Sequence, residues 1–208
     1  MGKVGVLVAM MKERSALFPY GLPNKTLSGD DVICRVSGIG KANAAVTAYR
    51  MCMEDEVDRV LCIGCACAVD PSLSIGDVLV ASRCVYHDVW CGKPNQRGQV
   101  QGEPAFYQPD FFKWSDAINS CLIGGVATGD CFIEDMLAAG SISTWYNVRA
   151  ADMESAAVAQ TCFKTGKDFS SIRVISDSPY KQVQTYEMFW VKAKEYFKPI
   201  RDLFLWEE

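Results

Sequence analysis

The chain has 208 residues, with 21 basic and 25 acidic side chains and a formal net charge of -4. This length suits one domain, and the acidic balance argues against a general nucleic-acid-binding protein, which normally presents a basic face. No stretch reaches the roughly 18 consecutive apolar residues that cross a membrane, so we expect neither nucleic acid nor a membrane as a partner.

Apolar runs alternate with amphipathic segments along the chain, which is typical of an α/β domain. The expected strands cover 4–9, 32–36, 60–63, 78–81, 122–128 and 170–175. The expected helices cover 42–54, 153–164 and 186–204, and a long loop rich in Gly and Pro covers 92–104. Because the strands are apolar throughout, we expect a largely buried central sheet. Without a repeat or linker to divide the chain, we expect residues 1–208 to form a single domain.

Ten cysteines are scattered through the sequence, mostly in apolar runs. The first residues resemble a strand rather than a secretory leader, so we expect reduced thiols in a cytoplasmic protein. Cys62, Cys65 and Cys67 form one cluster with a CxxC spacing, but a metal site usually needs a second ligand pair. The chain has no second CxxC and only one histidine, His87. We therefore expect small buried residues at a tight turn, and no metal.

In open α/β sheets, ligands bind beyond the ends of the strands. The segments that follow the expected strands are 10–13, 37–41, 64–67, 128–130 and 176–177. Glu13 and Asp177 are the carboxylates there that we regard as candidates for acid–base chemistry, and Glu154 opens the helix before the last strand. Each of the three alone could be a helix-start or turn residue, but their joint placement favours a functional site.

Eight sequence strings resemble, in the same order, those of the purine nucleoside phosphorylase superfamily, in the branch of the 5′-methylthioadenosine/S-adenosylhomocysteine nucleosidases. They are residues 8–13, 37–45, 75–78, 86–88, 98–104, 128–133, 152–157 and 173–177. The resemblance implies a three-layer α/β/α fold around a mixed, partly barrel-like central sheet, and usually a homodimer. It also implies a small nucleoside as substrate, with no metal or organic cofactor.

The resemblance gives each candidate carboxylate a role in cleaving a ribosyl N-glycosidic bond. Asp177 matches the acid that protonates purine N7, which requires a raised pKa. Glu13 matches the carboxylate that orients or deprotonates the attacking water, as in the two-carboxylate logic of other glycosidases. Glu154 matches the carboxylate that accepts hydrogen bonds from the ribose hydroxyls.

Further substrate-binding residues follow from the same resemblance. Met153 would pack under the sugar, Phe132 would stack on the base, and the Ile133 backbone would bind the edge of the base. Phe189 is a candidate for a hydrophobic cap over the 5′ group. The remaining candidates lie at the ends of expected strands, and they are Ala9, Cys65 and Ala66.

Two differences from phosphorylases favour water as the nucleophile. The segment 60–65 contains no arginine, although a buried phosphate dianion needs such a partner. Glu13 would also repel phosphate. Phosphorolysis, hydrolysis of another 5′-extended nucleoside such as futalosine, and nucleoside binding or storage without turnover remain open as alternatives.

The sequence also departs from the family. Cys65 stands where the family has a serine, and a thiol is the weaker hydrogen-bonding group. The segment 89–97 replaces an aromatic-rich stretch that reaches the partner subunit's 5′ pocket in relatives. Its Lys93 and Arg97 could meet an acidic 5′ tail or face solvent, so the sequence leaves the 5′ substituent open.

Overall fold

The structure is a computed structural model that describes residues 2–110, 121–181 and 186–205. Its strands are β1 (Lys3–Val8), β2 (Lys25–Thr26), β3 (Asp31–Val36), β4 (Arg59–Ala68), β5 (Val78–Tyr86), β6 (Leu122–Thr128), β7 (Ala150–Asp152), β8 (Asp168–Asp177) and β9 (Phe204–Leu205). Its helices are α1 (Met11–Leu17), α2 (Lys41–Met53), α3 (Met136–Tyr146), α4 (Ser155–Thr165), α5 (Tyr186–Tyr196) and α6 (Lys198–Arg201).

The strands form one mixed sheet in the order β7-β6-β5-β8-β4-β1-β3-β2-β9. An additional pairing of β7 with β4 joins the first strand of this series to the fifth. The strands from β7 to β4 therefore close into a barrel-like ring, while β1, β3, β2 and β9 extend from it as an open sheet. This confirms the expected mixed, partly barrel-like sheet.

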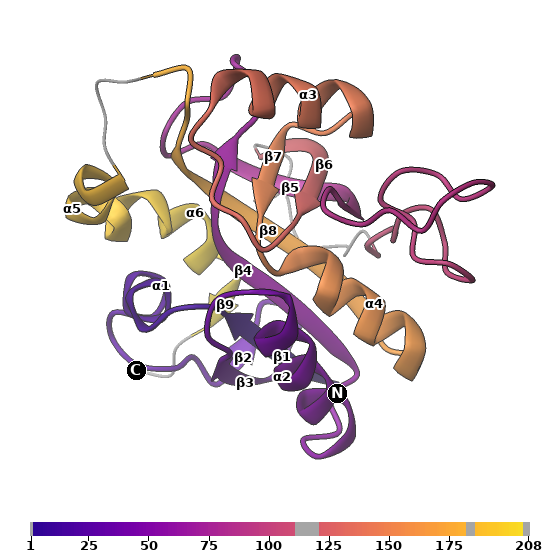
Figure 1. The fold of residues 1–208 in the computed structure, drawn as a ribbon. Helices are drawn as coiled ribbons and strands as arrows, with labels where there is room; N and C mark the ends of the chain where they lie inside the picture. Colours follow the sequence, from indigo (N-terminus) through magenta and orange to yellow (C-terminus); the bar gives the residue numbers. More distant parts are fainter. Residues whose placement is uncertain (1, 111–120, 182–185, 206–208) are drawn as a thin grey trace.

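Helices pack on both sides of this sheet, which confirms the expected three layers (Figure 1). On one side, α2 and α4 lie against each other and bury small side chains, including Ala48 and Ala159, in a core with β4 and β5. On the other side, α1, α5 and α6 bury Leu17, Phe189 and Phe197 against β1 and β8. Helix α3 covers the end of the ring formed by β6 and β7.

The expected strands all form, because each is an apolar run that fits a buried sheet. The expected tight turn at residues 64–67 is wrong, since β4 continues to Ala68 and pairs there with β8 and β7. Small side chains in this segment let β4 pass from the open sheet into the crowded ring. The residues that we expected beyond the strand therefore lie within it.

The helices differ more from expectation. Helices α1 and α3 were not predicted, and α4 begins at Ser155 rather than at 153, because Asp152 is the last residue of β7. The expected helix over 186–204 ends at Tyr196, and Pro199 lies in the first turn of α6, where its missing N–H costs nothing. Within the described ranges, no helix combines the length and apolar character that crossing a bilayer requires.

Candidate active site

One cavity lies where β1, β4 and β8 meet the turns after β3 and β6 and the start of α5. Nine of the ten predicted site residues line it, and they are Ala9, Glu13, Cys65, Ala66, Phe132, Ile133, Met153, Glu154 and Asp177. The tenth, Phe189, does not. The lining comes from seven separate segments of the chain, one of them running from the end of β7 to Glu154.

Glu13 lies in the first turn of α1 and is almost completely buried, at 2% exposure. Its Oε2 accepts hydrogen bonds from the backbone N–H groups of Ala9 and Met10, each at 2.9 Å. Its Oε1 accepts one from the N–H of Cys65 at 2.8 Å. Burial raises the pKa of Glu13, and these hydrogen bonds together with the charge of Arg173 oppose the rise. The carboxylate is therefore held in one orientation.

Arg173 is the residue that the sequence reasoning left without a role. It lies in the middle of β8, 1% exposed, and its guanidinium contacts Asp152 at 2.8 Å and Glu154 at 3.8 Å. Burial alone would lower the pKa of Arg173, but the surrounding carboxylates raise it, so the side chain stays charged. An arginine inside an apolar strand is itself a signal, because a buried charge needs buried partners.

Glu154 is the N-cap residue of α4 and is also buried. Its Oε1 accepts a hydrogen bond from the N–H of Gly40 at 3.0 Å. Burial and the neighbouring Asp152 raise the pKa of Glu154 to about 7, against the opposing charge of Arg173. Asp152 is fixed separately, by Thr128 Oγ1 at 2.6 Å and by the Ser155 hydroxyl.

Gly64 lets Glu13 and Arg173 approach the same point of β4. A Cβ at this position would lie 2.6 Å from Glu13 Oε1 and 2.7 Å from Arg173 Nη1. Real Cβ atoms do not come this close to other heavy atoms. The absence of a side chain here is therefore what permits a buried carboxylate and a buried guanidinium to face each other across the strand.

Asp177 reaches the cavity through an irregularity in the pairing of β4 and β8. Ala66 pairs with Ile175, but Cys67 pairs with Asp177, so Ser176 is an extra residue in β8. Such a β-bulge changes the direction in which the following side chain points. Asp177 Oδ1 accepts a hydrogen bond from the Ser176 hydroxyl at 2.6 Å. Burial raises the pKa of Asp177, while hydrogen bonds from Ser176 and Cys67 oppose the rise.

Aromatic side chains form one wall of the cavity. The rings of Phe132 and Tyr186 meet edge to face, with centroids 6.1 Å apart, and both side chains line the cavity. Phe189, predicted as a cap over the 5′ group, is 2% exposed and stacks on Tyr196 in the core, with centroids 5.4 Å apart. The structure thus contradicts the placement of Phe189 at the cavity and puts Tyr186, from the same helix, there instead.

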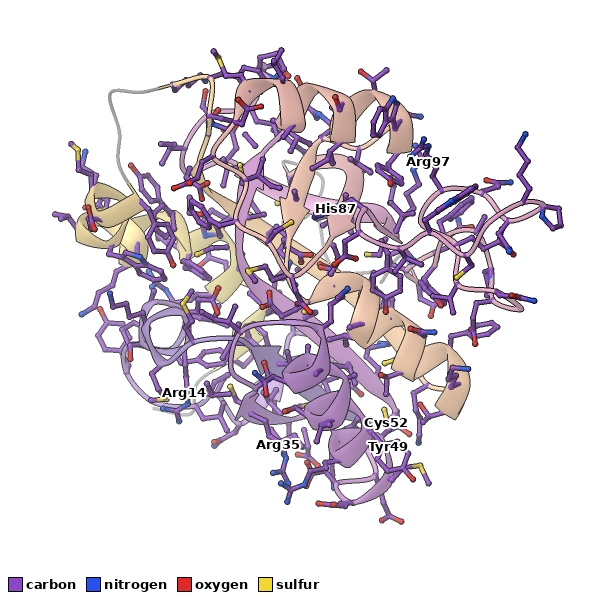
Figure 2. All side chains as sticks on the ribbon, in the orientation of Figure 1. Arg14, Arg35, Tyr49, Cys52, His87 and Arg97 are labelled. Atoms are coloured by element: carbon purple, nitrogen blue, oxygen red, sulfur yellow. The ribbon has the colours of Figure 1, made fainter. Side chains whose placement is uncertain are left out.

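Neither basic residue of the segment 89–97 lines this cavity. Lys93 is exposed. Arg97 lies between the loop and α3 (Figure 2), where its guanidinium carbon is 5.8 Å from the ring centroid of Trp90 and 4.7 Å from that of Trp145. Of the two expectations for Arg97, the structure favours a surface position, in which the cation stacks on aromatic rings.

The cysteine cluster does not gather in one place. The thiol of Cys62 accepts a hydrogen bond from Arg173 in the core, whereas Cys65 and Cys67 line the cavity. Within residues 2–110, 121–181 and 186–205, no three His, Cys, Asp or Glu side chains are grouped as metal ligands would be.

Comparisons with known proteins agree with this geometry. The family model described as "Phosphorylase superfamily" matches residues 24–197. The chain is 35% identical over 178 residues to the 5′-methylthioadenosine/S-adenosylhomocysteine nucleosidase of Marinomonas sp. (strain MWYL1), covering 80% of this chain and 77% of the relative. It is 34% identical over 179 residues to the protein of the same name from Anoxybacillus flavithermus, covering 81% and 77%.

Solved structures give the same result. An S-adenosylhomocysteine nucleosidase from Streptococcus pyogenes, in complex with 5-methylthiotubericidin, superposes with a TM-score of 0.84 at 28% identity, covering 97% of this chain and 95% of the other. The futalosine hydrolase of Helicobacter pylori superposes equally well, with a TM-score of 0.84 and 97% coverage of both chains, but at 23% identity it shows the fold alone. The chain belongs to the phosphorylase superfamily, in the family of the 5′-methylthioadenosine/S-adenosylhomocysteine nucleosidases.

Proposed function

We propose that the protein hydrolyses the N-glycosidic bond of 5′-modified adenosines such as 5′-methylthioadenosine and S-adenosylhomocysteine, and releases adenine. The names of its relatives support this substrate class. The observation that carries the proposal is the buried Glu13 carboxylate, whose two oxygens are fixed by three backbone N–H groups at the floor of the cavity. Such a carboxylate is suited to orient a water molecule.

Asp177 is the acid in this proposal. As the bond between C1′ and N9 breaks, its electron pair goes to the purine, and a proton from Asp177 to N7 neutralises the charge that develops there. A neutral carboxylic acid near pH 7 needs a raised pKa, and burial moves the pKa of Asp177 in that direction. The bulge at Ser176 supports the role, because it turns Asp177 toward the cavity.

Glu13 acts on the other reactant. The oxygen of the attacking water forms the new bond to C1′ while a proton passes to Glu13. Burial raises the pKa of this carboxylate and makes it a stronger base. Glu154 would accept hydrogen bonds from the ribose hydroxyls, Met153 would pack on the sugar, and Phe132 would stack on the base.

Hydrolysis is favoured over phosphorolysis by the charges around the cavity. Its lining, within the described part of the chain, includes the carboxylates of Glu13, Asp152, Glu154 and Asp177 and no Lys or Arg. Arg173 lies behind this lining and is already paired with Asp152. A phosphate dianion would meet acidic groups without a free cation, which is unfavourable in a buried site.

The test is to incubate the protein with 5′-methylthioadenosine, with and without phosphate, and to assay adenine and the sugar product. We expect adenine and free sugar in both conditions. Sugar 1-phosphate formed only with phosphate would establish phosphorolysis instead. Release of adenine or hypoxanthine from other 5′-extended nucleosides, including futalosine, but not from 5′-methylthioadenosine would replace the substrate. Binding without any product would indicate a nucleoside-binding protein.

Two Asp variants on one strand test the acid. Asp177→Asn should lower kcat by a factor on the order of 10² to 10⁴ while the nucleoside still stabilises the protein against heat. Asp168→Asn, at the opposite and exposed end of β8, is the matched control and should retain wild-type activity. Undiminished turnover in Asp177→Asn would refute the assignment.

We also infer that two copies of the chain associate, as the family resemblance implies. Helix α2 exposes Val46, Tyr49 and Met53 at 62%, 55% and 53%, and their spacing places them on one face. Sedimentation equilibrium should give about twice the 23.0 kDa chain mass.

All ten cysteines are free thiols, which supports a reducing compartment such as the cytoplasm as the site of action.

A further inference from the structure

The first residue of α2 and the turns that follow β5 and β6 meet at one group of charged side chains, which we call the Lys41 cluster: Lys41, Asp88 and Asp130. The ammonium of Lys41 lies 2.6 Å from Asp88 Oδ2 and 4.0 Å from Asp130 Oδ2. The backbone N–H of Lys41 donates to Asp130 Oδ1 at 2.8 Å, and the N–H of Asp130 donates to Asp88 Oδ2 at 3.0 Å. Every member is thus bonded to both others.

The cluster is more than a pair of solvated surface charges. The side chains of Lys41 and Asp88 are only 25% and 26% exposed, and the Lys41 ammonium also lies 5.5 Å above the ring centroid of Tyr86. Burial alone would raise the pKa of Asp88, but the hydrogen bonds from Lys41 and from the Asp130 N–H hold it below its ordinary value. Partial burial and several donors make such contacts stronger than an exposed ion pair.

The cluster is coupled to the cavity through the residue next to Lys41. Gly40 donates its N–H to Glu154 Oε1 at 3.0 Å, and Ile39 lines the cavity. Gly40 has a φ of 100°, and a Cβ there would lie 3.1 Å from Asp130 Oδ1. Asp130 therefore lies directly against Gly40, and its bond from the Lys41 N–H holds the peptide that follows the one donating to Glu154.

We propose that Lys41, Asp88 and Asp130 are positioning residues that hold the Gly40 N–H on Glu154 and thereby fix the carboxylate that receives the ribose hydroxyls. The inference rests on the proposed function, because it takes Glu154 as the ribose-binding group. Among the described residues, the other charged group close to the Glu154 carboxylate is the Arg173 guanidinium, 3.8 Å away. A loosened turn would leave this carboxylate without the hydrogen bond from the Gly40 N–H.

The neighbours of Glu154 determine how its ionisation should respond. Burial, Asp152 and Glu13 raise its pKa, while Arg173 and the Gly40 N–H lower it. Loosening the Gly40 bond removes one of the two lowering influences. The pH at which Glu154 ionises should therefore move upward when the Lys41 cluster is broken, and the activity limb that reports this ionisation should move with it.

The experiment compares Lys41→Met with Lys41→Arg, which keeps the charge, and with Lys164→Met. Lys164, which lies on α4, pairs with Glu103 and is the matched control for losing an ion-paired lysine. With 5′-methylthioadenosine, Lys41→Met should raise KM about tenfold, the size expected for weakening one charge-assisted hydrogen bond, and should shift the acidic limb of kcat/KM to higher pH. Lys41→Arg should stay within about threefold of wild type, and Lys164→Met should match wild type.

Two further measurements separate positioning from general damage. In calorimetry, Lys41→Met should weaken adenosine binding about tenfold and leave adenine binding unchanged, because adenine has no ribose. In a Glu154→Gln background, Lys41→Met should have little further effect on KM. Asp88→Asn, which keeps the shape of the side chain, should act in the same direction as Lys41→Met and serves if Lys41→Met does not fold.

The outcomes distinguish this inference from the function on which it rests. Wild-type hydrolysis together with an unchanged KM and limb in Lys41→Met and Asp88→Asn would overturn the inference and leave the function intact. Equal losses of adenosine and adenine affinity would also overturn it, since they would indicate a structural role. Absence of hydrolysis in the wild type would overturn the proposed function, and the adenosine and adenine affinities would still decide the role of the cluster.

Discussion

Replacing Gly64 by alanine tests the central packing of the site with a single methyl group. The new Cβ would lie 2.6 Å from Glu13 Oε1 and 2.7 Å from Arg173 Nη1, where ordinary contacts are 3.4–4 Å. Both charged groups must therefore move by nearly 1 Å. Overpacking of this kind costs about 1–3 kcal/mol, and weakening the bond from the Cys65 N–H to Glu13 adds about 1 kcal/mol.

We therefore expect Gly64→Ala to lower the free energy of unfolding by about 2–4 kcal/mol, measured by urea denaturation. Displacing Glu13 by this distance should also lower the rate of adenine release about 10²-fold. Gly140→Ala is the control: Gly140 lies inside α3, and the nearest side-chain atom that a Cβ would meet among the described residues is Tyr180 Oη at 3.5 Å. That variant should be unchanged or more stable by up to about 1 kcal/mol.

The comparison has a clear refuting result. If Gly64→Ala unfolds at the wild-type urea concentration and releases adenine at the wild-type rate, then Glu13 and Arg173 do not meet across β4 as described. A stable variant with low activity would show that the carboxylate moves while the core adapts. The expected loss of about 2–4 kcal/mol in the free energy of unfolding would then be wrong.

Three further predictions follow from the charges of the site. Arg173→Met leaves Asp152 and Glu154 buried without their cation, and should lower the free energy of unfolding by about 3–5 kcal/mol at pH 7, with a smaller loss at low pH where carboxylates are protonated; equal losses at both would contradict this. Because the folded-state pKa of Glu154 is raised from 4.5 to about 7, its contribution to stability is present below pH 4.5 and lost as pH rises to 7. The free energy of unfolding of Glu154→Gln, measured by urea denaturation, should therefore decline less over this pH range than that of the wild type. Cys67→Ala removes a hydrogen bond that lowers the pKa of Asp177, so the basic limb of its kcat/KM profile should move to higher pH. Cys67→Ser, which keeps a hydrogen-bond donor, should return the limb to its wild-type pH. An unmoved limb in Cys67→Ala would exclude this contact.

The strands and most of the candidate site could be predicted from the sequence for one physical reason. Each strand is an apolar run long enough to be recognised without its neighbours, and the ends of adjacent strands must lie close together. This is why side chains as distant in the chain as Glu13 and Asp177 line one cavity. The family strings gave these positions roles that periodicity alone could not provide.

The errors arose where the structure depends on partners distant in sequence. The small residues after Gly64 resemble a turn until β7 and β8 are seen to pair with them. Phe189 and Tyr186 lie on one helix, and only the packing of α5 decides which of them faces the cavity and which the core. The sequence predicted no role for Arg173, because that role depends on the two carboxylates that surround the side chain in the fold.

The bulge in β8 makes the site depend on strand register as well as residue identity. If Ser176 paired with Cys67 instead of bulging out of the ladder, the regular register would place Asp177 opposite Ala68. Side chains alternate between the faces of a strand, so the acid would turn to the other side of the sheet. A change that removed the bulge and kept all ten residues of β8 would therefore leave every named side chain in the chain and still turn the acid away from the cavity. Relatives in which the spacing between Arg173 and Asp177 differs by one residue should be compared by register before they are compared by composition.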